Sequence, residues 1–318
     1  MAERLLITGA TGFIGRALCQ VLSPRGYDLR LLLRPSRSIR GLPPGRSEVA
    51  IASLSDARSL RAALVGVQTI IHLASAEGEH RRRDLLATDV EGTALLVEQA
   101  RLAGVRRVVY LSHIGASRIS AFPFLQAKGM AEQILLESGL PTCILRTSSV
   151  FGPEDSFTNV IAMAASAMPV AFLVPQGQPQ LQPLWIGDLV AAIDLALREE
   201  IGFGQVLSIG GPEHLTIDDV VQTVLIACRR SRVLVRVWPP YLRLGANLLD
   251  AFLPYSPLTP YWVDYLAVNR TCEANALARW FGIRPARLAD RLDYLRHGRG
   301  LRGLMRFIWR GPLTLSAG

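Results

Sequence analysis

The residues with the clearest chemical meaning form a glycine-rich turn near the start of the chain. Gly9, Gly12 and Gly15 are spaced within Gly-Ala-Thr-Gly-Phe-Ile-Gly, directly after an apolar run at residues 5–7. After a strand, such glycines allow a tight turn, a close approach of the backbone to a pyrophosphate, and close packing of helix on strand. The helix that follows offers free N–H groups and the positive end of its dipole to the phosphates. A structural turn without a ligand is the alternative interpretation.

We therefore predict a dinucleotide site at this turn. The residues assigned to it are Gly9, Thr11, Gly12, Phe13, Ile14 and Gly15. Two arginines bear on which dinucleotide is bound, because the apolar run at residues 29–33 leads into Arg34-Pro35-Ser36-Arg37. A site selective for NAD usually carries an acidic residue here to bind the ribose 2′-hydroxyl, whereas guanidinium groups suit a 2′-phosphate. We expect Arg34 and Arg37 to favour NADP(H) over NAD(H), although a general arginine bias of the chain is the alternative explanation.

The elements that must position these residues alternate regularly in the first half of the chain. Short, continuous apolar runs at 49–52, 69–73, 108–111 and 143–145 are separated by helical stretches at 56–65, 82–103 and 124–138. Such runs are typical of parallel strands buried on both faces and joined by crossover helices. After Gly152-Pro153 the pattern becomes mainly helical, with brief strands.

This pattern predicts an α/β fold: a Rossmann-type doubly wound parallel sheet with a smaller, mostly helical C-terminal lobe. We assign residues 1–152 to the dinucleotide-binding domain and 153–318 to a substrate or docking lobe. Some strands and helices of the second segment are expected to return to the first domain.

Beyond the glycines, a series of short motifs resembles the extended and atypical short-chain dehydrogenase/reductases. The motifs, in the family's order, are Ile71–Ala74, Asp89–Thr93, Val108–Ser112, Arg146–Pro153 and Trp185–Leu189. The resemblance implies that Leu73, Ala74 and Ser112 line the cofactor. The C-terminal region, from Pro257 to Asn269 and from Phe281 to Pro285, is similar to an NAD(P)H-binding subgroup of NAD-dependent epimerase/dehydratase-like proteins. That subgroup includes alpha-subcomplex subunit nine of respiratory complex I.

The resemblance also implies a catalytic pair that this chain carries only in part. In short-chain dehydrogenases, a Tyr four residues before a Lys exchanges a proton while hydride moves. Lys128, the only lysine in the chain, stands at the Lys position and is expected to contact the cofactor ribose, but Phe124 replaces the Tyr. The usual active-site Ser or Thr after Ser112 is also missing. General acid catalysis contributes about 10²–10⁴-fold, so the standard redox reaction is expected to be badly impaired.

No residue is assigned firmly to catalysis, and three are candidates: Lys128, His113 and Ser112. His113 directly follows a strand, and an unperturbed histidine titrates near neutral pH, so it is the first replacement to consider for the missing Tyr. A structural role for His113 is the alternative. Asp89 and Asp188 are expected to cap helices.

The segment from Asp290 to Arg310 alternates arginines with aliphatic and aromatic residues and carries little acid. This pattern fits a helix on an anionic membrane surface. It fits equally well an anchor on a membrane protein complex, or a terminal helix that packs its apolar side on its own lobe. A membrane surface and a membrane complex are therefore the candidate partners.

Composition argues against several other classes of protein. Half of the residues are hydrophobic and 19% are charged, which is typical of a globular protein. No apolar run reaches the roughly 18 residues of a spanning helix, and the N-terminus does not resemble a signal peptide. We expect a cytoplasmic protein, peripheral on the inner face of the membrane if the basic segment docks there. No nucleic-acid motif accompanies the net charge of +9, so no nucleic-acid partner is expected.

The four cysteines lack metal-ligand spacing, so we expect reduced core thiols and no metal site. Two functions stay open. The first is a cofactor-binding structural, assembly or redox-sensing subunit associated with a respiratory or other membrane complex. The second is an NADPH-dependent reductase, epimerase or dehydratase with a nonstandard proton donor and a small-molecule substrate that the sequence does not identify.

Overall fold

The computed structural model describes residues 2–35, 47–76, 82–173, 179–256, 258–265, 268–295 and 300–310. The chain divides into two compact units. We call the first the Rossmann unit; it contains Met1–Thr147, Leu189–Ile209 and Arg279–Ile283. The second, the C-terminal unit, contains Ser148–Asp188, Gly210–Ala278 and Arg284–Gly318. The second half of the chain thus contributes two segments to the Rossmann unit.

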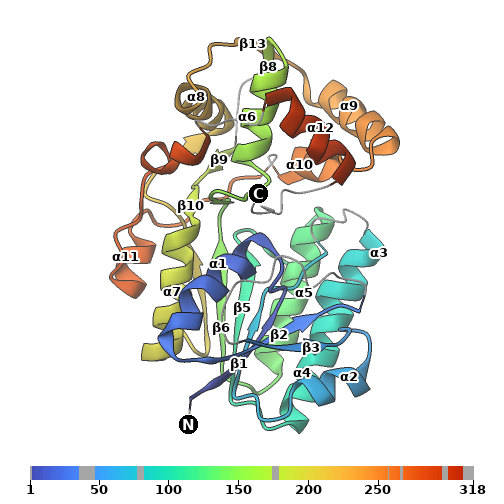
Figure 1. Ribbon diagram of the computed structural model, residues 1–318, viewed down its shortest axis with the longest axis vertical. Helices are drawn as coiled ribbons and strands as arrows, with labels where there is room; N and C mark the ends of the chain where they lie inside the picture. Colours follow the sequence, from blue (N-terminus) through green and yellow to red (C-terminus); the bar gives the residue numbers. More distant parts are fainter. Residues whose placement is uncertain are drawn as a thin grey trace. The chain divides into compact units, whose positions relative to one another are not determined.

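A parallel sheet of seven strands forms the centre of the Rossmann unit, counted over the described residues (Figure 1). Its strands are β1 (Arg4–Thr8), β2 (Asp28–Leu33), β3 (Ser47–Ile51), β4 (Thr69–His72), β5 (Arg107–His113), β6 (Thr142–Thr147) and β11 (Gln205–Ile209). They lie in the order β3-β2-β1-β4-β5-β6-β11, and all six pairings are parallel. The order reverses between β1 and β4, where open α/β sheets bind their ligands at the carboxyl ends of the strands. The predicted Rossmann-type fold is confirmed.

Helices cover both faces of this sheet (Figure 1). On one face, α2 (Ala57–Ala63), α4 (Gly92–Leu102) and α5 (Pro123–Glu137) share a core with the strands. On the other face lie α1 (Phe13–Leu22) and the part of α7 (Ile186–Glu199) that belongs to this unit. An ion pair between Arg25, just after α1, and the buried Asp194 of α7 joins these two helices. Between α3 (Arg82–Leu85) and α4, residues Leu86–Glu91 form a π-helical turn.

The C-terminal unit is mainly helical in the part that the structure describes. Its helices are α6 (Thr158–Ala167), α8 (Ile217–Ala227), α9 (Pro239–Phe252), α10 (Pro260–Tyr265) and α12 (Gly300–Arg310), while α11 (Ala276–Phe281) spans the boundary. Short strands pair β7 (Val150–Phe151) with β10 (Leu184–Trp185), β9 (Gln180–Leu181) with β12 (Leu215–Thr216), and β8 (Val170–Leu173) with β13 (Val233–Arg236). The core of this unit lies between α6, α8 and the segment 288–295.

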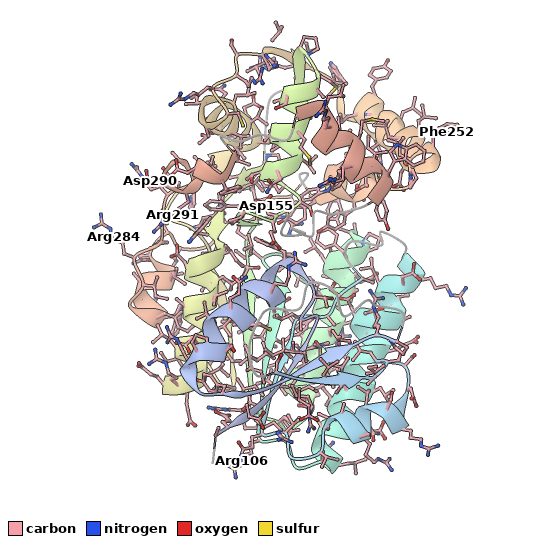
Figure 2. The ribbon with its side chains drawn as sticks, in the orientation of Figure 1. Arg106, Asp155, Phe252, Arg284, Asp290 and Arg291 are labelled. Carbon is pink, nitrogen blue, oxygen red and sulfur yellow. The ribbon has the colours of Figure 1, made fainter. Side chains whose placement is uncertain are left out.

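A buried carboxylate, Asp155, fixes the start of α6 (labelled in Figure 2). Its Oδ2 accepts hydrogen bonds from the Gly152 N–H at 2.9 Å and the Tyr294 hydroxyl at 3.2 Å, and its Oδ1 accepts one from the Phe157 N–H at 2.7 Å. Burial raises the pKa of Asp155, and the hydrogen bonds from Gly152, Thr158 and Phe157 oppose that rise. The interaction with Tyr294 joins the segment 288–295 to α6.

The basic C-terminal segment is not one continuous helix. Residues 289–295 form two short 3-10 turns, whose Leu292 and Leu295 are buried, and α12 begins only at Gly300. Phe307 of α12 is also buried, so part of the apolar side packs on the C-terminal unit itself. Arg296, His297 and Arg299 lie outside the described residues. Among the helices that the structure describes, none combines the length and the apolar character needed to cross a bilayer.

Candidate dinucleotide-binding site

The glycine-rich turn joins β1 to α1 at the point where the strand order reverses. Gly9 has a φ of +70°, and a Cβ there would stand 2.8 Å from the backbone nitrogen of Ala74. A Cβ on Gly15 would stand 2.3 Å from the carbonyl oxygen of Gly9. Side chains at either position would collide with fixed backbone, so the turn requires glycine at both. The structure thus places Leu73 and Ala74 directly against the turn.

No side chain caps the N-terminus of α1, so the first backbone N–H groups of this helix have no side-chain acceptor at the cap. Gly12 is the N-cap residue, with extended backbone and no capping side chain, and its own N–H donates to Gly9 O at 2.9 Å. Gly12 is exposed, and Phe13 and Ile14 are half-buried. The N–H groups at this end of α1 therefore suit the oxygens of a pyrophosphate, as the sequence predicts.

Arg16 is a residue at this turn that the sequence analysis did not assign. Its Nη1 donates a hydrogen bond to the Thr11 carbonyl oxygen at 2.6 Å, which braces the glycine-rich turn from the side of α1. The guanidinium also adds positive charge to a helix end that already favours anions. An arginine directly after the last glycine of the motif was the signal in the sequence.

A buried chain of hydrogen bonds links β1, β4 and α4 beneath the turn. The Thr8 Oγ1 accepts hydrogen bonds from the N–H groups of Leu73 and Ala74 and lies 2.7 Å from His72 Nδ1. His72 Nε2 lies 3.0 Å from Thr93 Oγ1, which donates to the Asp89 carbonyl oxygen at 2.6 Å. These partners assign the proton to Nε2 of a neutral imidazole, with the Thr8 hydroxyl donating to Nδ1.

His72 is therefore a structural residue and not a base. Burial lowers its pKa to about 3, and the nearby Lys128 ammonium acts in the same direction. Its side chain holds β4 in register with the glycine-rich turn, because it connects Thr8, at the end of β1, to Thr93 of α4.

The buried side chain of Lys128 forms an ion pair with Asp89. Its Nζ lies 3.1 Å from the Asp89 Oδ1, and the side chains of both residues are at most 5% exposed. The Asp89 carboxylate also accepts hydrogen bonds from the Ser75 hydroxyl at 2.7 Å and the Ala76 N–H at 2.9 Å. Asp89 lies inside the π-helical turn and does not cap a helix, so that prediction was wrong. The ribose contact expected of Lys128 stays a prediction.

The position of the missing Tyr and the residues beside it offer few polar groups that could exchange a proton. Phe124 is 2% exposed, and its ring meets that of His113 edge-on, with centroids 6.1 Å apart. Ser112 is fully buried, and its Oγ finds no hydrogen-bond partner among the described residues. The structure thus brings His113 next to the phenyl ring that replaces the phenol. A phenyl ring has no proton to exchange with a substrate.

Of the remaining predicted positions, Arg34 and Asp188 lie among the residues that the structure describes, and Arg37 does not. Arg34 is exposed directly after the carboxyl end of β2, as a contact to the ribose of a dinucleotide requires. Arg37 lies outside the described residues. Asp188 belongs to the C-terminal unit, where its carboxylate accepts a hydrogen bond from the Ala286 N–H at 2.8 Å. The expected capping role of Asp188 is replaced by this contact.

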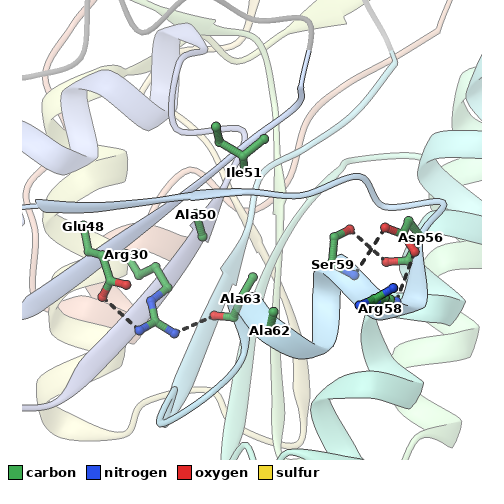
Figure 3. Close-up of a pocket in the computed structure, with 9 residues that line it drawn as sticks. All are labelled: Arg30, Glu48, Ala50, Ile51, Asp56, Arg58, Ser59, Ala62 and Ala63. Atoms are coloured by element: carbon green, nitrogen blue, oxygen red, sulfur yellow. Dashed lines mark hydrogen bonds and ion pairs between the residues drawn. The ribbon is translucent and has the colours of Figure 1, made fainter.

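One pocket of the Rossmann unit lies away from the glycine-rich turn. It has a volume of about 440 Å³ and lies beside β3 and α2 (Figure 3). Two of its polar residues are engaged within the protein: Arg30 donates to Glu48 and to the Ala63 carbonyl oxygen, and Asp56 caps α2. A second pocket, of about 490 Å³, includes Arg106 and Glu3 at the amino ends of the strands. Neither pocket contains a residue of the predicted cofactor site.

The cysteines offer no further reactive centre in the described structure. All four are free thiols, and burial raises the pKa of Cys19 and of Cys143 to about 12. No group of three or more His, Cys, Asp or Glu side chains that could hold a metal ion occurs among the residues described.

Comparison with known proteins extends the evidence from the glycine-rich turn to most of the chain. The model of the NAD dependent epimerase/dehydratase family matches residues 5–210. The chain belongs to this family. The match runs from β1 to the end of β11 and includes Gly9, Asp89 and Lys128. The family binds NAD(P). The resemblance inferred from the motifs is confirmed.

Similar curated proteins differ in their described roles. Sterol demethylase protein B of Methylococcus capsulatus is 32% identical over 77% of this chain and 80% of its own length. Subunit 9 of the NADH dehydrogenase [ubiquinone] 1 alpha subcomplex, from mitochondria of Arabidopsis thaliana, is 28% identical over 77% of this chain. The chain covers 61% of that relative, which is less than two thirds of its length. The relatives of this chain therefore include a protein that is named for an enzyme activity and a subunit of a respiratory complex.

Solved structures agree with the fold. The crystal structure of gox2253 is 25% identical, with a TM-score of 0.74 over 94% of this chain and 99% of the other. UDP-glucose 4-epimerase of Thermotoga maritima, solved with UDP-glucose, is 18% identical, with a TM-score of 0.70 over 95% of this chain and all of the other. At that identity, the epimerase supports the shared fold alone.

Proposed function

We propose that this family member binds NADP(H) and serves as a structural, assembly or redox-sensing subunit associated with a respiratory or other membrane complex. On this proposal it does not catalyse the standard reaction of short-chain dehydrogenases. The observation that carries the proposal is the state of the catalytic pair: Phe124 replaces the proton donor, and Lys128 is held by Asp89. The similarity to a subunit of complex I in Arabidopsis supports an assembly role.

The residues present at the turn fit a dinucleotide. The space that a Cβ would fill at Gly9 and Gly15 is occupied by backbone, which lets β1 and α1 meet tightly below the helix N-terminus. The N–H groups of Phe13, Ile14 and Gly15 would hold the pyrophosphate, and Arg16 would add positive charge beside it. When bound, the nicotinamide can donate or accept a hydride.

The preference for NADP(H) rests on Arg34. Its exposed guanidinium stands at the end of β2, where an acidic residue would repel a 2′-phosphate and a guanidinium can bind it through charge-assisted hydrogen bonds.

The substitution Arg34→Glu tests this preference. We expect it to weaken NADPH binding about tenfold to a hundredfold, with little effect on NADH, because one charge-assisted contact contributes roughly 1.5–3 kcal/mol. Calorimetric titration of the full chain with each dinucleotide measures both affinities. Arg106→Glu is the matched control, since Arg106 is exposed at the opposite, amino-terminal edge of the sheet (Figure 2). Equal losses for NADPH and NADH in the Arg34 variant would contradict the proposed preference.

A second candidate function is an NADPH-dependent reductase, epimerase or dehydratase with His113 as its proton donor. The contact between His113 and Phe124 favours this alternative, because it places an imidazole beside the position that the family's Tyr occupies. The relatives described as sterol demethylase protein B and 3-beta-hydroxysteroid dehydrogenase also support it. Turnover of the bound dinucleotide would distinguish this enzyme from the proposed noncatalytic subunit.

A further inference from the structure

Helix α9 of the C-terminal unit is unusually exposed for an apolar helix. Among its side chains that the structure describes, only Ala246 is buried. Tyr241 is 71% exposed, Leu248 52% and Phe252 81%. Phe252, at the end of the helix, points away from the ribbon in Figure 2. A helix on the surface of a water-soluble protein normally packs such residues against the core.

The exposed apolar residues of α9 follow one face of the helix. Tyr241, Leu244, Leu248 and Phe252 are spaced by three or four residues, so their side chains form a stripe along the helix axis. Trp238 precedes the helix and Tyr255 follows it, and both are exposed. The stripe therefore has aromatic residues with polar tips at both ends.

Helix α12 repeats this arrangement. Phe307 is buried on its inner side, whereas Leu301, Met305 and Trp309 recur every four residues and are each at least 48% exposed. The two helices are connected, because the Tyr255 N–H after α9 donates to the Ile308 carbonyl oxygen of α12 at 3.1 Å. Figure 1 shows α12 between α6 and α9. We call the exposed apolar residues of these two helices the α9–α12 surface; they are Tyr241, Leu244, Leu248, Phe252, Leu301, Met305 and Trp309.

The charges of α12 next to this surface are positive, whereas α9 carries one exposed acidic residue, Asp250. Residues 300–310 include three arginines and no acidic residue, and Arg302 and Arg306 are exposed beside Leu301 and Met305. The arginine of α9, Arg243, forms an ion pair with Asp264 at 3.0 Å, so the positive charge is concentrated on α12. An anionic surface complements this distribution.

We propose that the α9–α12 surface docks the protein on an anionic lipid bilayer. The aliphatic and phenyl side chains would enter the boundary of the acyl chains, and the Trp and Tyr rings would lie at the level of the headgroups. Arg302 and Arg306 would extend their guanidinium groups to lipid phosphates while their methylene stems cover apolar surface. The attachment is peripheral, and it is independent of the dinucleotide site.

Flotation of the 318-residue chain with vesicles tests the proposal. We expect it to float with vesicles of phosphatidylcholine that contain phosphatidylglycerol, and to bind pure phosphatidylcholine vesicles more weakly. The double substitution Leu248→Ser and Phe252→Ser should lower partitioning at least about tenfold, because it removes two exposed apolar groups from the contact. Each of Arg302→Gln and Arg306→Gln should lower it about fivefold on anionic vesicles and reduce its salt dependence.

Ile226→Ser is the matched control, since Ile226 of α8 is 77% exposed in the same unit but lies outside the α9–α12 surface. It should bind vesicles as the wild type does. Unchanged circular dichroism and unchanged dinucleotide affinity would establish that the variants are folded. The proposal is overturned if the wild type does not bind either kind of vesicle, or if the Leu248 and Phe252 variant binds normally. It is also overturned if that variant only converts a dimer to a monomer, because the surface would then be covered by a second copy.

Discussion

At the scale of single residues, the glycine-rich turn shows how backbone contacts alone specify a residue type. Gly9 and Gly15 are required because their neighbours are backbone atoms that cannot move aside, whereas a flexible side chain could adjust. The glycine spacing is local in the sequence, so the turn could be predicted without the structure. Arg16 was not predicted: its place after the last glycine is visible in the sequence, but its contact depends on the direction of its side chain back toward Thr11.

We expect Gly15→Ala to destabilise the protein by about 1–3 kcal/mol and to weaken dinucleotide binding, because its Cβ would force the Gly9 carbonyl out of place. Thermal unfolding and calorimetric titration measure the two effects. Gly245→Ala in α9 is the control: a Cβ there meets open space, so helix stability should stay equal or rise by about 0.5–1 kcal/mol. If the two variants have the same stability and the same dinucleotide affinity, the turn does not depend on the close contact at Gly15.

His72 predicts a measurable pH dependence of stability. Its pKa is lowered to about 3 in the folded protein by burial, while the ordinary value is 6.5. Between these values the unfolded chain binds a proton that the folded chain does not, so the stability present above pH 6.5 is lost as the pH falls. The loss is about 1.4 kcal/mol per pH unit, or roughly 2 kcal/mol from about pH 6.5 to about pH 5.

Urea unfolding of the wild type and His72→Gln across this range isolates the contribution. We expect the difference in unfolding free energy between the two proteins to shrink by about 2 kcal/mol toward the acidic end. The substitution His214→Gln, at an exposed histidine, controls for the loss of an imidazole. A constant difference across the pH range would mean that His72 takes up its proton at the same pH in the folded and the unfolded protein, which contradicts the lowered pKa.

At the scale of elements, the π-helical turn Leu86–Glu91 brings Asp89 to Lys128 of α5. The sequence predicted a helix start and a cap at Asp89, because an acidic residue before a helical pattern usually caps it. The pairing could not be predicted, since it depends on how β4, α4 and α5 pack, and not on the residues near Asp89. The same holds for α9, whose amphipathic pattern gives no sign of whether another element covers its apolar face.

The substitution Lys128→Met should destabilise the protein by about 3–5 kcal/mol, because it leaves the Asp89 carboxylate buried without its cation. Adding Asp89→Asn should restore most of that loss, since the amide removes the charge and still offers an acceptor to the Ala76 N–H. A double-mutant cycle by urea unfolding measures the coupling. Additive effects of the two substitutions would show that the buried pair does not act as a unit.

At the scale of the whole molecule, the sequence predicted the alternation of strands and helices and the parallel sheet, because buried strands are continuous apolar runs. It did not predict the division of the basic C-terminal segment. Leu292, Leu295 and Phe307 turn into the C-terminal unit, whereas Met305 and Trp309 are exposed. Composition and spacing describe all of these residues alike, and only tertiary packing separates them.

The central claim is that this family member holds a dinucleotide without the family's proton donor. The most direct test is to purify the protein gently, identify and quantify its bound nucleotide, and follow the oxidation state after adding carbonyl substrates. We predict NADPH in near-equal amount to protein, which stays reduced. Oxidation that the variant His113→Phe abolishes would support an enzyme with a replaced donor and contradict the proposed noncatalytic role. Protein that retains no dinucleotide and rebinds none would contradict the account of the glycine-rich turn itself.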